Sequence, residues 1–354
     1  MIFMAERTFI DTGLLNYLCK DTKGNIWNSF LDVTASNGLK LQGRGSLFLP
    51  DDMQFLEFIG LGAILERVPS TLRSDIERHI NSLFTQKKPI KEIEINKTLN
   101  SIFEKCLTAC ESLSEITPQG LLDQHKKHHS YLHGKSAYFL DHAISNRFLD
   151  GLSTNPQNVY KQICRNLSWQ LATTILRSTF NAISINKHPD LVLRLFEPLM
   201  AIILHSAFKH GSPPNFFRLA ETAYLSYMRQ HEKKLNSSDL KWVQEYRREY
   251  QTGNKKDLTD CIYLDRALLG YLELTDGEIR QLPVTVLTMD RPIVVLNRLK
   301  LLRNMLEKLK DEVEGWSLNP IDSCKVLCLE QINGNLVYKD TIHHAFVLDY
   351  DPEN

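Results

Sequence analysis

The sequence lacks the paired cysteines that mark a disulfide framework or a zinc site. It contains seven cysteines, an odd number, and the pairs nearest in sequence, Cys106 with Cys110 and Cys324 with Cys328, are four residues apart. A zinc motif needs a two-residue gap and a matching second pair. Disulfide frameworks are typical of small secreted proteins, so we expect a reducing compartment and no structural zinc.

A long uninterrupted apolar run is also missing. The longest apolar stretch, residues 191–208, contains Arg194, Glu197 and His205. A membrane-spanning helix needs about 20 consecutive, mostly apolar residues, so we expect this stretch to be a core helix. No basic segment followed by an apolar leader precedes residue 7. These absences predict a cytoplasmic protein with no membrane partner.

Net charge is absent as well, since 42 Lys and Arg balance 42 Asp and Glu. This balance argues against a globally basic nucleic-acid binder. The charge is nevertheless uneven: residues 71–250 hold 24 basic against 17 acidic side chains, and the rest hold 18 against 25. An acidic part that binds a cation and a basic part that binds a polyanion would suit phosphodiester chemistry, although chance surface charge explains the division equally well. No repeat of fixed period indicates a solenoid.

The pattern that is present is that of an α/β protein, and 43% hydrophobic residues can build its core. Short apolar runs followed by helical spacing occur near both ends of the chain, whereas residues 70–250 show only helical spacing. We expect a mostly parallel sheet flanked by helices, formed by residues 1–69 and 251–354, with an all-α insertion at 70–250. The expected strands are 8–10, 46–50 and 284–288, and the expected helices of the α/β part are 14–18, 51–67, 260–271 and 292–309.

Turn signals predict further strands. Asn333-Gly334 lies between apolar runs at 325–329 and 336–338, which is typical of a β-hairpin. Residues 343–349 are expected to add an edge strand. Alternating apolar and polar residues at 32–41 predict a peripheral strand, which Asn37-Gly38 would turn back as a second hairpin.

Acidic residues stand where these elements begin or end. Asp11 follows the first strand, and Asp290 follows the strand at 284–288. Glu57 lies among apolar residues of an early helix, and Asp260 opens a later one. In open α/β sheets, ligands collect at the carboxyl ends of the strands. The alternative interpretation is that these acids only cap helices or lie on the surface.

The ordered set resembles the PIN-domain nucleases. Their pattern is an Asp-Thr pair after the first strand, a Glu on an early helix, an Asp opening a later helix and a Thr-x-Asp after the next strand. The four acids match these places in order within residues 7–66 and 256–300. This sequence departs from the pattern by placing Gly13 where Asn or Ser is commoner, and by about 200 residues between the second and third acids. Asp257 and Asp265 therefore stay open as alternatives to Asp260.

The resemblance implies that the catalytic, metal-binding residues are Asp11, Glu57, Asp260 and Asp290. Crowded carboxylates repel one another unless a cation neutralises them, and an all-oxygen set selects Mg²⁺ or Mn²⁺. Such an ion activates water for attack on a phosphodiester. Thr12 and Thr288 are expected to hold the acids or the water by hydrogen bonds.

The expected function is a metal-dependent nuclease acting on RNA, in which the helical insertion selects the substrate. A DNA-directed nuclease is one alternative, and a non-catalytic interaction module with a degenerate PIN fold is another. The haloacid dehalogenase pattern also begins with a strand-end Asp, but Gly13 stands where its second Asp would be. A protein partner for the insertion and a homodimer both stay open.

Two basic groups are candidates for nucleic-acid contact. Both have positive side chains near aromatic ones, which suits phosphates and bases. The first group, around residues 125–133, also fits a solvated surface helix or a face of histidines that binds a metal. The second group, at 241–250, also fits long cationic side chains lying over ordinary core aromatics. The candidate residues are Lys126, Lys127, His128, His129, Lys241, Arg247 and Arg248. The sequence does not determine substrate specificity, the pathway or the role of the C-terminal hairpin.

Overall fold

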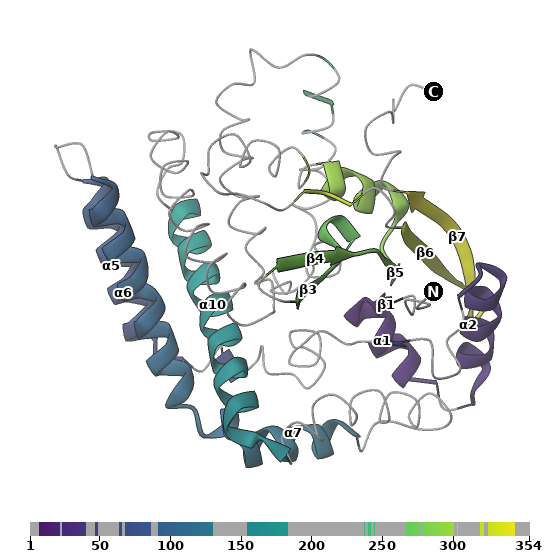
Figure 1. Cartoon of the computed structure of the whole chain (residues 1–354), viewed down its shortest axis with the longest axis horizontal. Helices are drawn as coiled ribbons and strands as arrows, with labels where there is room; N and C mark the ends of the chain where they lie inside the picture. Colours follow the sequence, from purple (N-terminus) through teal and green to yellow (C-terminus); the bar gives the residue numbers. More distant parts are fainter. Residues whose placement is uncertain are drawn as a thin grey trace.

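The structure is a computed structural model of the whole chain. It describes residues 7–21, 23–39, 47–48, 64–65, 68–85, 91–129, 154–182, 237, 240–241, 244, 267–275, 278–300, 303, 319–321 and 325–343. These residues form an α/β structure that contains a mostly parallel open sheet (Figure 1).

The main sheet has five strands in the order β2-β1-β5-β6-β7. All neighbouring pairs are parallel except β6 with β7. Every residue of β5 is buried, as expected for an inner strand of a parallel sheet, which is covered on both faces. The strands are β1 (Arg7–Ile10), β2 (Leu47–Phe48), β5 (Val284–Thr288), β6 (Lys325–Ile332) and β7 (Asn335–His343).

The register of β1 and β5 brings their carboxyl ends to the same level. Ile10 pairs with Leu287, and the backbone N–H of Asp11 donates to the carbonyl of Leu287 over 2.8 Å. The residues that follow the two strands are therefore neighbours at one edge of the sheet, although 277 positions separate Asp11 from Thr288.

The predicted C-terminal hairpin is present. Asn333 and Gly334 have φ values of 50° and 83°, the positive values that a type I′ turn requires at both central residues. The hairpin contacts α2, where the hydroxyl of Ser29 accepts a hydrogen bond of 2.9 Å from the N–H of Leu336. Residues 344–349, where most of the expected edge strand falls, lie outside the described residues.

The first two helices are α1 (Thr12–Cys19) and α2 (Asn25–Ser36). The strand predicted at 32–41 is wrong, because α2 continues through Ser36 and Gly38 then takes a φ of 80° just after the helix end. Asn37-Gly38 thus ends a helix. At the start of α2 the buried carboxylate of Asp21 accepts hydrogen bonds from three backbone N–H groups, those of Lys23, Gly24 and Trp27.

The elements described between residues 68 and 182 are all helices, as the spacing predicts. Helix α10 packs against α5 and α6, and Figure 1 shows the three lying together on one side of the sheet. They bury apolar faces, and the rings of Phe103 and Trp169 lie 3.8 Å apart between centroids. The helices are α5 (Ser70–Phe84), α6 (Glu92–Glu111), η1 (Ser114–Ile116), α7 (Pro118–His129) and α10 (Pro156–Ala182).

Most of residues 183–250 lie outside the described part, so the boundary of the helical insertion stays a prediction. Among the described helices, none combines the length and apolar composition needed to cross a bilayer.

The hairpin formed by residues 271–282 was not expected. The helix predicted to reach Tyr271 ends at Leu269, and antiparallel strands β3 (Tyr271–Thr275) and β4 (Glu278–Leu282) follow. Gly270 has a φ of 68°, and a Cβ on it would collide with the carbonyl of Leu282, so the close approach of the two chain segments needs glycine here.

Candidate functional site

Asp11 joins β1 to α1. Its backbone occupies the N-cap position, with φ −61° and ψ 145°, and its carbonyl accepts from the N–H of Leu15 over 3.0 Å. Its side chain makes no capping hydrogen bond to α1. The helix start therefore accounts for the backbone of Asp11 but not for its carboxylate, which is directed elsewhere.

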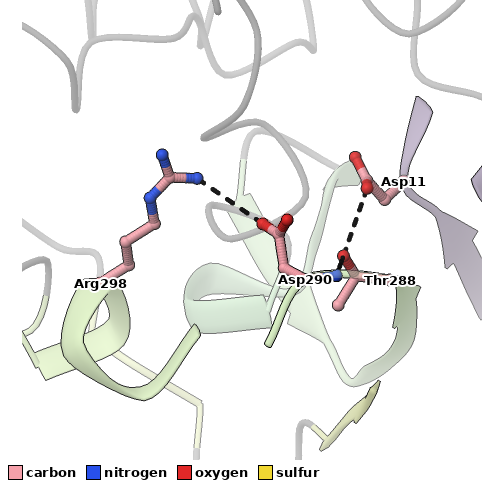
Figure 2. A network of polar contacts seen from close by, with 4 residues as sticks. All are labelled: Asp11, Thr288, Asp290 and Arg298. Carbon is pink, nitrogen blue, oxygen red and sulfur yellow. Dashed lines mark hydrogen bonds and ion pairs between the residues drawn. The ribbon is translucent and has the colours of Figure 1, made fainter. Parts of the chain in front are cut away.

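The hydroxyl of Thr288 links the two predicted acids (Figure 2). It donates to Oδ2 of Asp11 over 3.2 Å and accepts from the backbone N–H of Asp290 over 3.0 Å. A threonine hydroxyl has one proton and two lone pairs, so it can make both bonds at once. Thr288 is fully buried, whereas Asp11 and Asp290 are partly exposed. The structure thus brings the three residues together at the carboxyl edge of the sheet.

Arg298 is a fourth member of this network and was missed from the sequence. It lies on the helix over 292–300, is 5% exposed, and places Nη1 3.9 Å from Oδ2 of Asp290. At this distance the two groups form an ion pair without a short hydrogen bond. The available signal was a cation between buried apolar positions, Leu296 and Leu299, on the helix that follows Asp290.

Gly13 leaves room beside the Asp11 carboxylate. A Cβ built on Gly13 would lie 3.1 Å from Oδ2 of Asp11, which is tighter than an ordinary van der Waals contact. The departure from the PIN pattern at this position therefore borders the site directly. A side chain here would press on the oxygen that Thr288 holds.

The network contains two carboxylates and a hydroxyl. Oxygen groups of this kind are the ligands that hard cations prefer. Within the described residues, no three or more His, Cys, Asp or Glu side chains gather closely enough to hold a metal. Glu57, Asp257, Asp260 and Asp265 lie outside those residues. The described residues thus include two of the four predicted ligands, Asp11 and Asp290. Their carboxylate oxygens are the kind of ligand that Mg²⁺ and Mn²⁺ prefer.

Cys328 lies beside the site on β6, paired in register with Thr288. Burial raises the pKa of its thiol to about 12, and the negative charges of Asp340 and Asp290 act in the same direction. A thiol is nucleophilic only as the thiolate, so this cysteine is inert near neutral pH. The chemistry of the site therefore falls to its oxygen groups.

The remaining predicted residues lie on other elements. Thr12 is buried at the first position of α1, and Lys126 and Lys127 are exposed near the end of α7. His128 and His129 are in the last turn of α7, and Lys241 lies in a helical segment. Arg247 and Arg248 lie outside the described residues.

No protein-family model, curated protein or solved structure matches this chain.

Proposed function

We propose that this protein is a metal-dependent nuclease that hydrolyses phosphodiester bonds, with RNA as its substrate. The observation that carries the proposal is the junction of Asp11 and Asp290 at the hydroxyl of Thr288, at the carboxyl edge of a parallel sheet. Asp11 has the backbone of a helix cap, yet its carboxylate turns to this junction. That arrangement favours a ligand role over the capping role.

The chemistry follows from the donors. Carboxylates that are held close together repel one another, and this repulsion is relieved when a cation binds between them. A divalent ion bound there would lower the pKa of a coordinated water and stabilise the charge that develops on the phosphate. Asp11 and Asp290 would hold the ion, and Thr288 would fix Asp11 through the hydrogen bond to Oδ2. Glu57 and one of Asp257, Asp260 and Asp265 would complete the ligand set.

The choice of RNA comes from the resemblance to PIN-domain nucleases and from the excess of basic residues at 71–250. The exposed Lys126 and Lys127 are the described candidates for backbone contact. Matched RNA and DNA oligonucleotides of one sequence, cleaved in parallel with Mn²⁺, decide between the two polymers.

The decisive variant is Asp11→Asn. Asn keeps the size of the side chain and can still accept from Thr288, but it removes the charge that the cation needs. We expect Mn²⁺-dependent cleavage to fall at least about a hundredfold, with little change in melting temperature. Asp32→Asn is the matched control, because Asp32 is an exposed acid on α2, and it should cut at the parent rate.

An Asp11→Asn variant that cuts as fast as the parent would rule out the assignment. A parent that binds a partner protein but cleaves neither polymer with any divalent metal would instead support a non-catalytic interaction module.

A further inference from the structure

Arg298 is a buried cation whose position needs a physical reason. Its side chain is 6% exposed, while that of its partner Asp290 is 41% exposed. A charged side chain is rarely buried unless it is paired, because losing water costs several kcal/mol per ion. The guanidinium therefore lies on the protein side of the pair, and the carboxylate lies on the solvent side.

The direction of this contact matters for the site. In Figure 2, Arg298 reaches Oδ2 of Asp290 from the side opposite Asp11 and Thr288. The backbone N–H of Asp290 is meanwhile bound by Thr288. The backbone of Asp290 is thus held by a hydroxyl, and its Oδ2 lies in an ion pair with a guanidinium.

We propose that Arg298 is a positioning residue that orients Asp290 for cation binding while reducing the affinity of the site for that cation. This inference rests on the proposed function, and it concerns how one ligand is held. The ion pair at Oδ2 limits the orientations that the Asp290 carboxylate can take. The positive charge of Arg298 also repels a divalent cation at the same carboxylate, and this repulsion is strong because a buried charge is poorly screened.

Orienting Asp290 should favour turnover, whereas repelling the cation should weaken metal binding. A purely structural role would not affect these two quantities in opposite directions. If Arg298 only balanced the charge of Asp290 in the fold, its removal would loosen the site and weaken metal binding together with turnover. If it positions and repels, removal should tighten metal binding and slow turnover.

The test uses Arg298→Met, which removes the charge but keeps much of the length, and Arg298→Lys, which keeps the charge without the planar fork. Mn²⁺ alone is titrated into the full chain by calorimetry, without nucleic acid, and kcat for RNA cleavage is measured separately. For Arg298→Met we expect about tenfold tighter Mn²⁺ binding and about tenfold lower kcat. For Arg298→Lys we expect the Mn²⁺ affinity of the parent and an intermediate kcat.

Arg78→Met is the control, because Arg78 is an exposed arginine on α5, and it should leave both values unchanged. Should Arg298→Met not fold, Arg298→Gln replaces it with the same expectation, since Gln is neutral and too short to keep the contact with Oδ2. A neutral variant that binds Mn²⁺ as weakly as the parent, or more weakly, overturns the inference while the proposed function stands. A parent that binds no Mn²⁺ and cleaves nothing overturns both.

Discussion

Thr288 is the residue on which the candidate site depends most directly. Its buried hydroxyl serves Asp11 and the backbone of Asp290 at once, so one side chain fixes the positions of both acids. The sequence led us to expect that Thr288 holds the acids or the water by hydrogen bonds, and the structure gives its partners as Oδ2 of Asp11 and the backbone N–H of Asp290. The pattern singled out Asp11, Thr288 and Asp290, and the structure shows how these three residues are connected.

Replacing Thr288 with Val should show whether its two hydrogen bonds, and not only its packing, hold the site together. Val has the same shape but no hydroxyl, so the Thr288→Val variant loses both bonds, and we expect the free energy of unfolding to fall by about 1 to 3 kcal/mol. Mn²⁺ affinity should fall too, because Asp11 loses the donor that holds Oδ2. Urea unfolding and a Mn²⁺ titration measure the two effects. Thr288→Ser retains the hydroxyl and should stay close to the parent, and equal behaviour of the two variants would contradict this role.

Helix α1 is the element that carries Asp11, and its first turn shows how the element serves the site. Gly13 is exposed within this turn, where Ala would ordinarily favour the helix by about 0.5 to 1 kcal/mol. The added Cβ would lie 3.1 Å from Oδ2 of Asp11 and must displace that oxygen. Stability and cation binding are therefore expected to respond in opposite directions to this substitution.

For Gly13→Ala we expect a melting temperature equal to or above that of the parent and cation binding several-fold weaker. Asn16→Ala is the matched control, since Asn16 is exposed on the same helix and should gain stability without affecting Mn²⁺. Thermal unfolding in EDTA and calorimetric titration give the two quantities. A Gly13→Ala protein that binds Mn²⁺ as tightly as the parent would show that the contact is relieved without cost to the site.

Helices and strands with strong local sequence signals could be predicted. Those that depend on whether a turn dipeptide ends a helix or joins two strands could not. The Asn333-Gly334 hairpin follows from residues that tolerate positive φ, and α5 and α10 follow from long amphipathic spacing. At Asn37-Gly38 the same kind of dipeptide ends a helix, which sequence alone does not distinguish from a hairpin turn. The β3–β4 hairpin had a usable signal, Asp276-Gly277 between alternating runs, that the helical pattern before it obscured.

Arg298 was missed for a different reason. Its pairing with Asp290 depends on the path of the chain between β5 and the following helix, and a single cation in an apolar helix usually indicates an exposed edge. Asp11 and Asp290 were easier, because strand ends in a parallel sheet meet at one edge.

At the scale of the whole molecule, the described residues comprise a sheet that carries the acids and a group of packed helices that carries exposed lysines (Figure 1). The five described cysteines are all buried, and burial raises the pKa of each thiol, so none is activated as a nucleophile. The proposed function therefore depends on the oxygen groups at the sheet edge and not on a cysteine.

The most direct test of the central claim is a crystal structure of the full chain. The crystals are grown with Mn²⁺, and the ion is located by its anomalous scattering. The account predicts one Mn²⁺ coordinated by carboxylate oxygens of both Asp11 and Asp290, at about 2.0 to 2.2 Å, together with Glu57 and one of Asp257, Asp260 and Asp265. A fully occupied Mn²⁺ elsewhere, with Asp11 and Asp290 binding no common ion, would contradict it.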